Sequence, residues 1–248
     1  GVGWIPLGDA AARGIKIANS PGYSTETVGE FGIGLMLAIV RKIHVFLRDN
    51  SSPEVEMCLY GRTIGILGTG NIGKAFCKIM LGFGCKVVAF DLIANKEMES
   101  EGVVYQPLME VLKAEIISLH CPLNEQTKHL INKDTIALMQ QGVVLINTSR
   151  GGLINTHDAI KALKSGQISA LGIDVYEQEE KLFFRNLSED IIQDDEIQRL
   201  MSFPNVLITA HQAFFTQEAM EQIATTTLNN ILLLSENAKL DTQAALLA

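Results

Sequence analysis

Residues 64–73, with the sequence IGILGTGNIG, decide the fold of this chain. A short apolar run typical of a buried strand leads directly into glycines with the spacing GxGxxG. Gly68 permits a tight turn, Gly70 lets a pyrophosphate approach the backbone, and Gly73 lets the next helix pack closely against the strand. The pattern is weak when it stands alone, but between a strand and a helix it predicts a dinucleotide-binding turn.

The residues that follow the turn indicate which dinucleotide it binds. The backbone N–H groups near Asn71 and Ile72, at the start of the predicted helix, would face the anionic phosphates. Asp91 ends the next apolar run, about 20 residues further on, where a carboxylate accepts hydrogen bonds from a ribose diol and repels a 2′-phosphate. Residues 92–94 include no basic side chain. NAD is therefore favoured over NADP. The alternative is that the glycines form only a tight turn and that Asp91 is a solvated strand end.

After the turn, short apolar runs alternate with helical stretches. The predicted strands lie at 64–67, 86–90, 116–119, 143–147, 170–174 and 206–209. Helices fit between them, for instance at 72–81 before Gly82 and Gly84, and at 156–164 before Gly166. Such alternation, with almost wholly apolar strands, is typical of a parallel sheet covered on both faces. The predicted fold class is α/β, a doubly wound parallel sheet in a Rossmann-like domain.

Two further helices are predicted outside that alternation. A long and largely buried helix spans 25–48, because apolar residues recur at helical spacing from Val28 to Ile43. A polar stretch at 48–56 then predicts a surface loop. The amphipathic stretch at 216–234 has no strand after it, so it is expected to pack outside the sheet.

Composition excludes several classes of protein. The 248 residues are 47% hydrophobic and 19% charged, unlike disordered, collagen-like or coiled-coil chains. The formal charge of -8 repels phosphate backbones and anionic membrane surfaces, so neither nucleic acid nor a membrane is expected as a partner. The longest apolar run, at 31–40, is about half of what a membrane-spanning helix needs. Four cysteines at irregular spacings predict free thiols and a cytoplasmic protein.

Ionisable residues follow several of the predicted strands, where open α/β sheets place their ligands. Arg150 offers a fork of donors suited to a carboxylate, although a surface salt bridge is an alternative. Glu179 and His211 follow the last two strands, and an imidazole beside a carboxylate can shuttle a proton. A hydrogen-bonded structural histidine is the alternative there. His120 also follows a strand, and spacing alone does not separate it from His211.

Four longer motifs carry a resemblance to a known family. They are the turn at 68–73 with Asp91, NTSRGGLI at 147–154, GIDVYEQE at 172–179 and HQAF at 211–214. In this order they resemble the D-isomer-specific 2-hydroxyacid dehydrogenases over roughly the whole chain, and the fermentative D-lactate dehydrogenases most closely. The resemblance implies an enzyme that uses NAD and no metal, and that interconverts pyruvate and D-lactate.

The same resemblance implies roles for individual residues. Arg150 would bind the carboxylate of a 2-oxo acid and polarise its carbonyl, His211 would be the acid and base, and Glu179 would orient His211. Tyr23 and Phe214 would contact the substrate with Arg150 and His211, although Tyr23 also fits a hinge-packing aromatic and Phe214 a core residue. The residues implied beside the cofactor are Gly68, Gly70, Asn71, Ile72, Gly73, Asp91, Cys121, Pro122, Thr127, Thr148, Ser149, Arg150 and Asp174, with His120 on the same side.

The resemblance also implies how the chain is divided. Residues 1–20 would be a remnant of a flavodoxin-like substrate domain, 21–214 the NAD-binding domain, and 215–248 a C-terminal helix that returns to the substrate domain. In the family, roughly the first half of the substrate domain lies before the point where Gly1 falls. A cytoplasmic homodimer through the helix near 25–48 is expected, with a small 2-oxo or 2-hydroxy acid as substrate.

Three other functions are compatible with the motifs. The substrate could be a bulkier 2-oxo acid. The chain could be a non-enzymatic NAD-sensing interaction protein, like the corepressors that resemble this family. It could also be a structural remnant without activity. Tyr23 and the HQAF motif at 211–214 favour the D-lactate enzyme.

Overall fold

The structure, a computed structural model, describes residues 5–45, 56–179, 182 and 193–236. The predicted surface loop at 48–56 lies almost wholly outside the described residues. The chain divides into two compact units, one of residues 28–213 and a smaller one of residues 1–27 and 214–248. The predicted assignment of these parts to an NAD-binding and a substrate domain stays a prediction.

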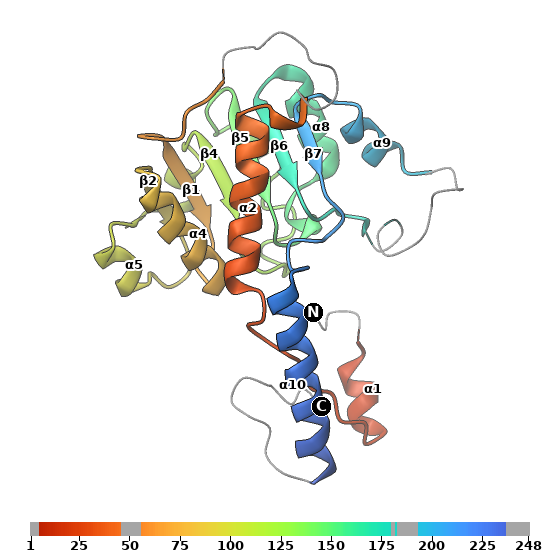
Figure 1. Cartoon of the computed structure of the whole chain (residues 1–248). Helices are drawn as coiled ribbons and strands as arrows, with labels where there is room; N and C mark the ends of the chain where they lie inside the picture. The colour runs from red at the N-terminus through yellow and green to blue at the C-terminus, as the bar shows by residue number, and fades with distance from the viewer. Residues whose placement is uncertain (1–4, 46–55, 180–181, 183–192, 237–248) are drawn as a thin grey trace. The chain divides into compact units, whose positions relative to one another are not determined.

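The larger unit is built on one sheet of seven parallel strands (Figure 1). The strands are β1 (Thr63–Leu67), β2 (Lys86–Phe90), β3 (Val104–Tyr105), β4 (Ile116–Leu119), β5 (Val143–Asn147), β6 (Ile168–Ile173) and β7 (Val206–Ile208). Their spatial order is β3-β2-β1-β4-β5-β6-β7, so the direction of winding reverses between β1 and β4. Sheets of this kind bind ligands at the carboxyl ends of the strands, near that reversal. The predicted doubly wound α/β sheet is confirmed.

Helices cover both faces of this sheet. One face is covered by α2 (Thr25–Val40), α4 (Asn71–Gly82) and α5 (Lys96–Ser100), and the other by α6 (Leu108–Val111), α7 (Lys133–Ile136), α8 (Thr156–Ser165) and α9 (Asp195–Met201). Alternate strand residues point into two separate hydrophobic cores, with Ile64 and Ile66 in the first and Ile117 and Leu119 in the second. Because both faces are buried, the strands are almost wholly apolar.

Helix α2 packs closely against α4 but is shorter than predicted. A Cβ added at Gly29 would lie 3.3 Å from the Cβ of Ala75 and 3.6 Å from the backbone nitrogen of Phe76, so the two helix backbones approach each other there. The prediction of one helix over 25–48 is wrong, because α2 ends at Val40 and Lys42 adopts a left-handed φ of 49°. The helical spacing of apolar residues continues past this turn, which is why the sequence did not reveal it.

Elsewhere, the strands and helices begin and end close to the positions predicted from the sequence. Strand β6 begins two residues before its predicted start, at Ile168, and β7 ends one residue early, at Ile208. Strand β3 was not predicted, because its two residues are too few for an apolar pattern. Helix α8 ends at Ser165, and the next residue, Gly166, has a φ of 73°, the left-handed conformation that glycine adopts at a helix end.

The smaller unit contains α1 (Leu7–Ala12) and α10 (Gln217–Ser235). The hydroxyl oxygen of Thr216 caps α10 by accepting a hydrogen bond from the Ala219 N–H at 3.3 Å. Further along, the amide nitrogen of Asn230 donates to the carbonyl oxygen of Asn19 at 3.3 Å. The helix predicted at 216–234 is therefore present, and it contacts the N-terminal segment of the same unit.

Candidate active site

The glycine turn between β1 and α4 has the space that a phosphate group needs. Gly68 has a φ of 96°, and a Cβ added there would lie 2.6 Å from the backbone nitrogen of Cys121. A Cβ at Gly73 would lie 2.1 Å from the carbonyl oxygen of Gly68. At Gly70, by contrast, an added Cβ meets none of the described atoms within 4 Å. The turn therefore fits the pyrophosphate of a dinucleotide, with the first N–H groups of α4, at Asn71 and beyond, directed at it.

Asp91 follows β2 and lies against the same turn. Strands β1 and β2 pair as far as Leu67 and Phe90, so the chain leaves the sheet at Gly68 and Asp91 side by side. One carboxylate oxygen of Asp91 accepts hydrogen bonds from the Thr69 N–H at 2.6 Å and the Thr69 hydroxyl at 3.0 Å. The other accepts the N–H of Leu92 at 2.7 Å. The carboxylate is thus fixed beside the turn, where a cofactor ribose would lie.

His120 lies behind the turn, in a largely apolar environment. Its Nε2 is 2.9 Å from the hydroxyl of Ser118, and its ring centre is 4.8 Å from that of Phe76. Its Nδ1 is buried without a hydrogen-bond partner among the described residues. Burial lowers the pKa of His120 to about 3, because the charged imidazolium is poorly solvated there. His120 is therefore neutral near pH 7 and unsuited to donating a proton.

The loop after β4 is tied to the loop after β5. The carbonyl oxygen of Cys121 accepts a hydrogen bond from the Ser149 hydroxyl at 2.7 Å. Burial raises the pKa of the Cys121 thiol to about 11, so the thiol is protonated near pH 7. The Thr127 hydroxyl donates to the carbonyl oxygen of Pro122 at 2.6 Å and holds the loop in a compact turn. The loops after β4 and β5, where the family resemblance implies contacts with the cofactor, are thus joined by a hydrogen bond.

Arg150 is presented to solvent by a rigid turn after β5. Buried Asn147 accepts the Ser149 N–H at 3.0 Å and donates its amide to the carbonyl oxygen of Arg150 at 2.9 Å. The guanidinium of Arg150 donates to the Ser149 carbonyl oxygen at 2.6 Å. A Cβ at Gly151 would lie 2.1 Å from the backbone carbonyl of Tyr176, so this turn packs directly against the loop after β6. The exposed guanidinium keeps further donors for an anionic ligand.

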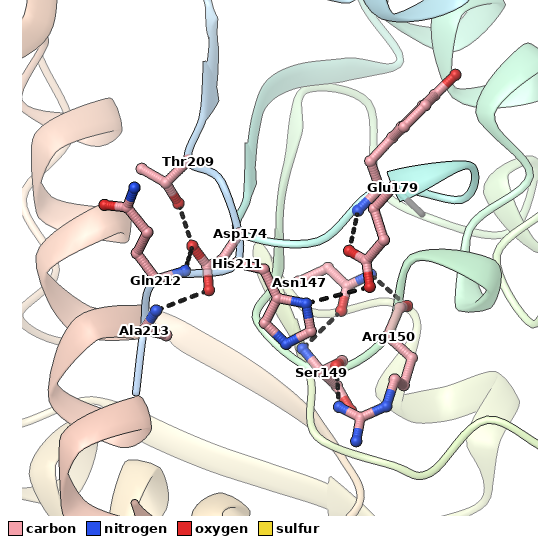
Figure 2. Close-up of polar contacts among 10 residues, drawn as sticks. Asn147, Ser149, Arg150, Asp174, Glu179, Thr209, His211, Gln212 and Ala213 are labelled. Atoms are coloured by element: carbon pink, nitrogen blue, oxygen red, sulfur yellow. Dashed lines mark hydrogen bonds and ion pairs between the residues drawn. The ribbon is translucent and has the colours of Figure 1, made fainter. Parts of the chain in front are cut away.

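His211 and Glu179 meet at the carboxyl edge of the sheet (Figure 2). His211 Nδ1 lies 3.1 Å from a carboxylate oxygen of Glu179, and the other oxygen of Glu179 accepts the Tyr176 N–H at 3.0 Å. The second bond fixes the carboxylate, which in turn fixes the imidazole. His211 has a φ of 53°, a left-handed conformation that is uncommon for residues other than glycine. Such conformations persist where surrounding contacts hold them.

Asp174 supplies those surrounding contacts. Its fully buried carboxylate accepts hydrogen bonds from the Thr209 hydroxyl at 2.5 Å and from the N–H groups of Gln212 and Ala213, both at 2.9 Å (Figure 2). Its carbonyl oxygen accepts the His211 N–H at 2.7 Å. The family resemblance implied for Asp174 only a place beside the cofactor. The structure shows in addition that it holds the turn from which His211 projects.

Tyr23 and Phe214 both belong to the smaller unit. Their rings are 6.2 Å apart and meet edge to face, and Phe214 also meets Phe215 at 6.0 Å. Such aromatic contacts are expected to stabilise the unit in which they lie. The contact fits the alternative interpretation of these residues as packing aromatics, and their contact with a substrate stays a prediction.

Sequence reasoning missed several residues that position the site. Thr69 lies inside the glycine pattern and contacts Asp91, Asn147 shapes the Arg150 turn, and Thr209 contacts Asp174. A polar residue at the end of an apolar strand was the available signal for Asn147 and Thr209, since buried polar groups need partners. Thr69 occupies a variable position of the glycine pattern and gave no signal.

Other features of the described residues add no second site. No group of three or more histidine, cysteine, aspartate or glutamate residues in the described ranges could hold a metal ion. The helices described here include none that is both long and apolar enough to cross a bilayer. The four cysteines are free thiols, of which Cys77 and Cys85 are buried.

The parallel sheet, its glycine turn and the carboxylate after β2 are the features of a dinucleotide-dependent oxidoreductase. Comparison with known proteins narrows this class. Residues 33–213 match the family described as D-isomer specific 2-hydroxyacid dehydrogenase, NAD binding domain. The chain belongs to the D-isomer specific 2-hydroxyacid dehydrogenase family, so it is an NAD-dependent oxidoreductase that acts on D-2-hydroxy acids.

Individual relatives are similar to this chain over most of its length. 2-Hydroxyacid dehydrogenase homolog 1 of Schizosaccharomyces pombe is 47% identical over 235 residues, which cover 92% of this chain and 71% of the relative. The pyruvate reductase of Chlamydomonas reinhardtii superposes with a TM-score of 0.92 at 39% identity, covering 98% of this chain and 75% of that one. D-lactate dehydrogenase of Lactobacillus jensenii, solved with NAD+, gives 0.86 at 31% identity, covering 97% and 74%.

Proposed function

We propose that this chain interconverts pyruvate and D-lactate. The observation that carries the proposal is the His211–Glu179 pair, which lies on the same sheet edge as the exposed guanidinium of Arg150 (Figure 2). A proton donor beside an anion-binding fork suits a small 2-oxo acid, whose carboxylate and carbonyl are adjacent. The pyruvate reductase and D-lactate dehydrogenase among the similar structures support this substrate, whereas the S. pombe relative carries a general name.

Arg150 binds the substrate in this proposal. Its guanidinium can donate two parallel hydrogen bonds to the carboxylate of the 2-oxo acid, which fixes the substrate's orientation. The same positive charge polarises the neighbouring carbonyl and stabilises the negative charge that develops on its oxygen. Because Asn147 and Ser149 hold the Arg150 turn, little reorganisation is needed at the moment of reaction.

His211 moves the proton. When bound, NADH supplies the hydride that reduces the substrate carbonyl carbon. Glu179 faces Nδ1 of His211, so Nε2 is the nitrogen that delivers a proton to the carbonyl oxygen. The Glu179 carboxylate, held against Nδ1, fixes the ring orientation throughout. In the oxidative direction the same Nε2 accepts the proton of the D-2-hydroxy acid.

The cofactor would be held by the residues along the β1, β2, β4 and β5 ends. Gly68, Gly70 and Gly73 would admit the pyrophosphate, and Asp91 would bind the adenosine ribose. The turns of Cys121, Pro122 and Thr127, and of Thr148 to Arg150, would lie beside the remaining cofactor. Asp174 would contact the cofactor from the β6 end. Tyr23 and Phe214 are proposed to contact the substrate on the strength of the family resemblance alone.

A substrate series tests this proposal. We expect kcat/KM to be highest for pyruvate and to fall with longer 2-oxo acids, because an added methylene must be accommodated in the same site. Steady-state turnover of NADH with pyruvate, 2-oxobutyrate and 2-oxoisocaproate gives the series. A clear preference for the longest acid would show that the substrate is a bulkier 2-oxo acid than pyruvate. NADH binding without turnover of any acid would favour a non-enzymatic NAD-sensing role.

We also propose a homodimer through the helix near 25–48. Half of α2 is buried within the larger unit, so the partner would contact the remaining exposed positions, such as Glu30 and Gly34. An added Cβ at Gly34 meets none of the described atoms within 4 Å, so Gly34→Arg is compatible with folding. Sedimentation velocity should show a dimer for the unchanged chain and a monomer for Gly34→Arg. A monomeric unchanged chain would contradict the proposal.

A further inference from the structure

Tyr105 and Thr69 form a chain of hydrogen bonds that ends on Asp91. Tyr105 lies on the edge strand β3, where it pairs with Ala89 of β2. Its hydroxyl is 2.9 Å from the hydroxyl of Thr69, which is 3.0 Å from a carboxylate oxygen of Asp91. Thr69 is 4% exposed, so water competes little for its hydroxyl. Three elements, β3, the glycine turn and the end of β2, are thereby joined through side chains.

The direction of these hydrogen bonds follows from the chemistry of the groups. An ionised carboxylate only accepts, so the Thr69 hydroxyl must donate its proton to Asp91. The Thr69 oxygen can then only accept from Tyr105, which donates its phenolic proton. Each bond polarises the next, and the terminal bond to a charged group is the stronger kind.

This series of hydrogen bonds leaves the Asp91 carboxylate little freedom to rotate. A carboxylate offers about four acceptor sites. In this structure the Thr69 N–H, the Thr69 hydroxyl and the Leu92 N–H occupy three positions around it. The carboxylate plane is therefore set before any ligand arrives. A remaining acceptor position can meet a ribose hydroxyl, whereas a 2′-phosphate would meet a fixed negative charge.

We propose that Tyr105 and Thr69 are positioning residues that set the orientation of Asp91 and thereby the preference for NAD over NADP. This inference rests on the proposed contact between Asp91 and the adenosine ribose. Cofactor specificity is the difference between the affinities for NAD and for NADP. A carboxylate that is free to turn away would bind the NAD ribose less tightly and would also repel the 2′-phosphate of NADP less strongly, so both changes reduce the preference. Neither Tyr105 nor Thr69 needs to touch the cofactor.

Cofactor titrations of matched variants test the proposal. Tyr105→Phe removes the hydroxyl while its ring keeps packing against the core, and Thr69→Val removes the donor at similar size. From the usual worth of such hydrogen bonds we expect NADH affinity to fall about threefold in Tyr105→Phe and about tenfold in Thr69→Val. The preference for NADH over NADPH should fall in both. Thr69→Ser, which keeps the hydroxyl, should retain most of the preference.

Two controls separate positioning from a general effect on structure. Tyr60→Phe removes a phenolic hydroxyl from a tyrosine that precedes β1 and is 79% exposed, and it should change neither affinity. In an Asp91→Ala background, Tyr105→Phe should have no further effect on the preference, because the residue on which it acts is gone. Thermal unfolding of each variant shows that the protein is folded.

The outcomes distinguish the inference from the function on which it rests. If Asp91→Ala lowers the preference while Tyr105→Phe and Thr69→Val keep it, the positioning role is overturned and the ribose contact stands. If Asp91→Ala keeps the preference, the ribose contact itself fails, and the inference fails with it. Equal effects of Tyr105→Phe with and without Asp91 would also overturn the inference, since they would show an effect that does not pass through the carboxylate.

Discussion

Two histidines at the same edge of the sheet have opposite environments. His120 follows β4, lies against the Phe76 ring, and is kept neutral by burial, with its pKa lowered to about 3. His211 follows β7 and faces the carboxylate of Glu179 at 3.1 Å. The first environment is apolar and penalises a charged ring, whereas the second sets a carboxylate against one ring nitrogen and so fixes the orientation of the imidazole. Position at a strand end therefore does not define a catalytic histidine; the groups packed around it do.

The largest expected difference between the two histidines is in turnover. His211→Asn should lower kcat for pyruvate reduction by about a thousandfold, within the range that a general acid contributes. His120→Asn should lower it far less, since a neutral buried ring donates no proton. NADH affinity, measured by fluorescence titration, should stay near that of the unchanged chain in His211→Asn. A larger loss of kcat in His120→Asn would reverse the assignment.

The next largest effect is expected at Asp174, whose carboxylate holds the His211 turn. Among the described residues no carboxylate holds His120 in this way. Asp174→Asn keeps the size of the side chain, but its amide cannot accept from Thr209, Gln212 and Ala213 together. The left-handed His211 should then move, and a displacement of about 1 Å can cost on the order of a hundredfold in rate. Stopped-flow single turnovers report this loss directly. Unchanged turnover would show that the buried carboxylate is dispensable for placing His211.

A smaller effect concerns stability below neutral pH. Because folding lowers the pKa of His120 from 6.5 to about 3, the unfolded chain binds a proton in this window that the folded chain does not. The stabilising contribution is complete above pH 6.5 and is lost as the pH falls towards 3, by at most about 1.4 kcal/mol per pH unit. Urea unfolding between pH 7 and 5 should therefore show a shallower loss of stability in His120→Asn.

If His120→Asn and the unchanged chain lost stability equally between pH 7 and 5, the buried neutral state of His120 would be refuted.

The sheet and the candidate site at its carboxyl edge could be predicted from the sequence, because both depend on local patterns of apolar and glycine residues. Apolar strands and the glycines from Gly68 to Gly73 fix the fold through backbone requirements that need no distant partner. The two histidines could not be separated, because the Phe76 ring and the Glu179 carboxylate that distinguish them reach their positions only in the folded chain. For the same reason the contact between Tyr105 and Thr69, 36 positions apart, could not be predicted from the sequence.

Helix ends show the same limit. The end of α8 was predicted because Gly166 is a local signal, whereas the end of α2 at Val40 has none: the left-handed residue two positions on is Lys42, not glycine. At this end a later segment of the chain packs against α2: the Met57 N–H donates a hydrogen bond to the Val40 carbonyl oxygen at 3.3 Å. Local propensity is a weak guide where tertiary contacts decide.

Steady-state reduction of pyruvate with saturating NADH tests whether the His211–Glu179 pair supplies the proton and His120 does not. Glu179→Gln should lower kcat, because the carboxylate that fixes the imidazole through Nδ1 is lost. His120→Asn should lower kcat far less, because its buried neutral ring donates no proton. A larger loss of kcat in His120→Asn than in Glu179→Gln would contradict this assignment.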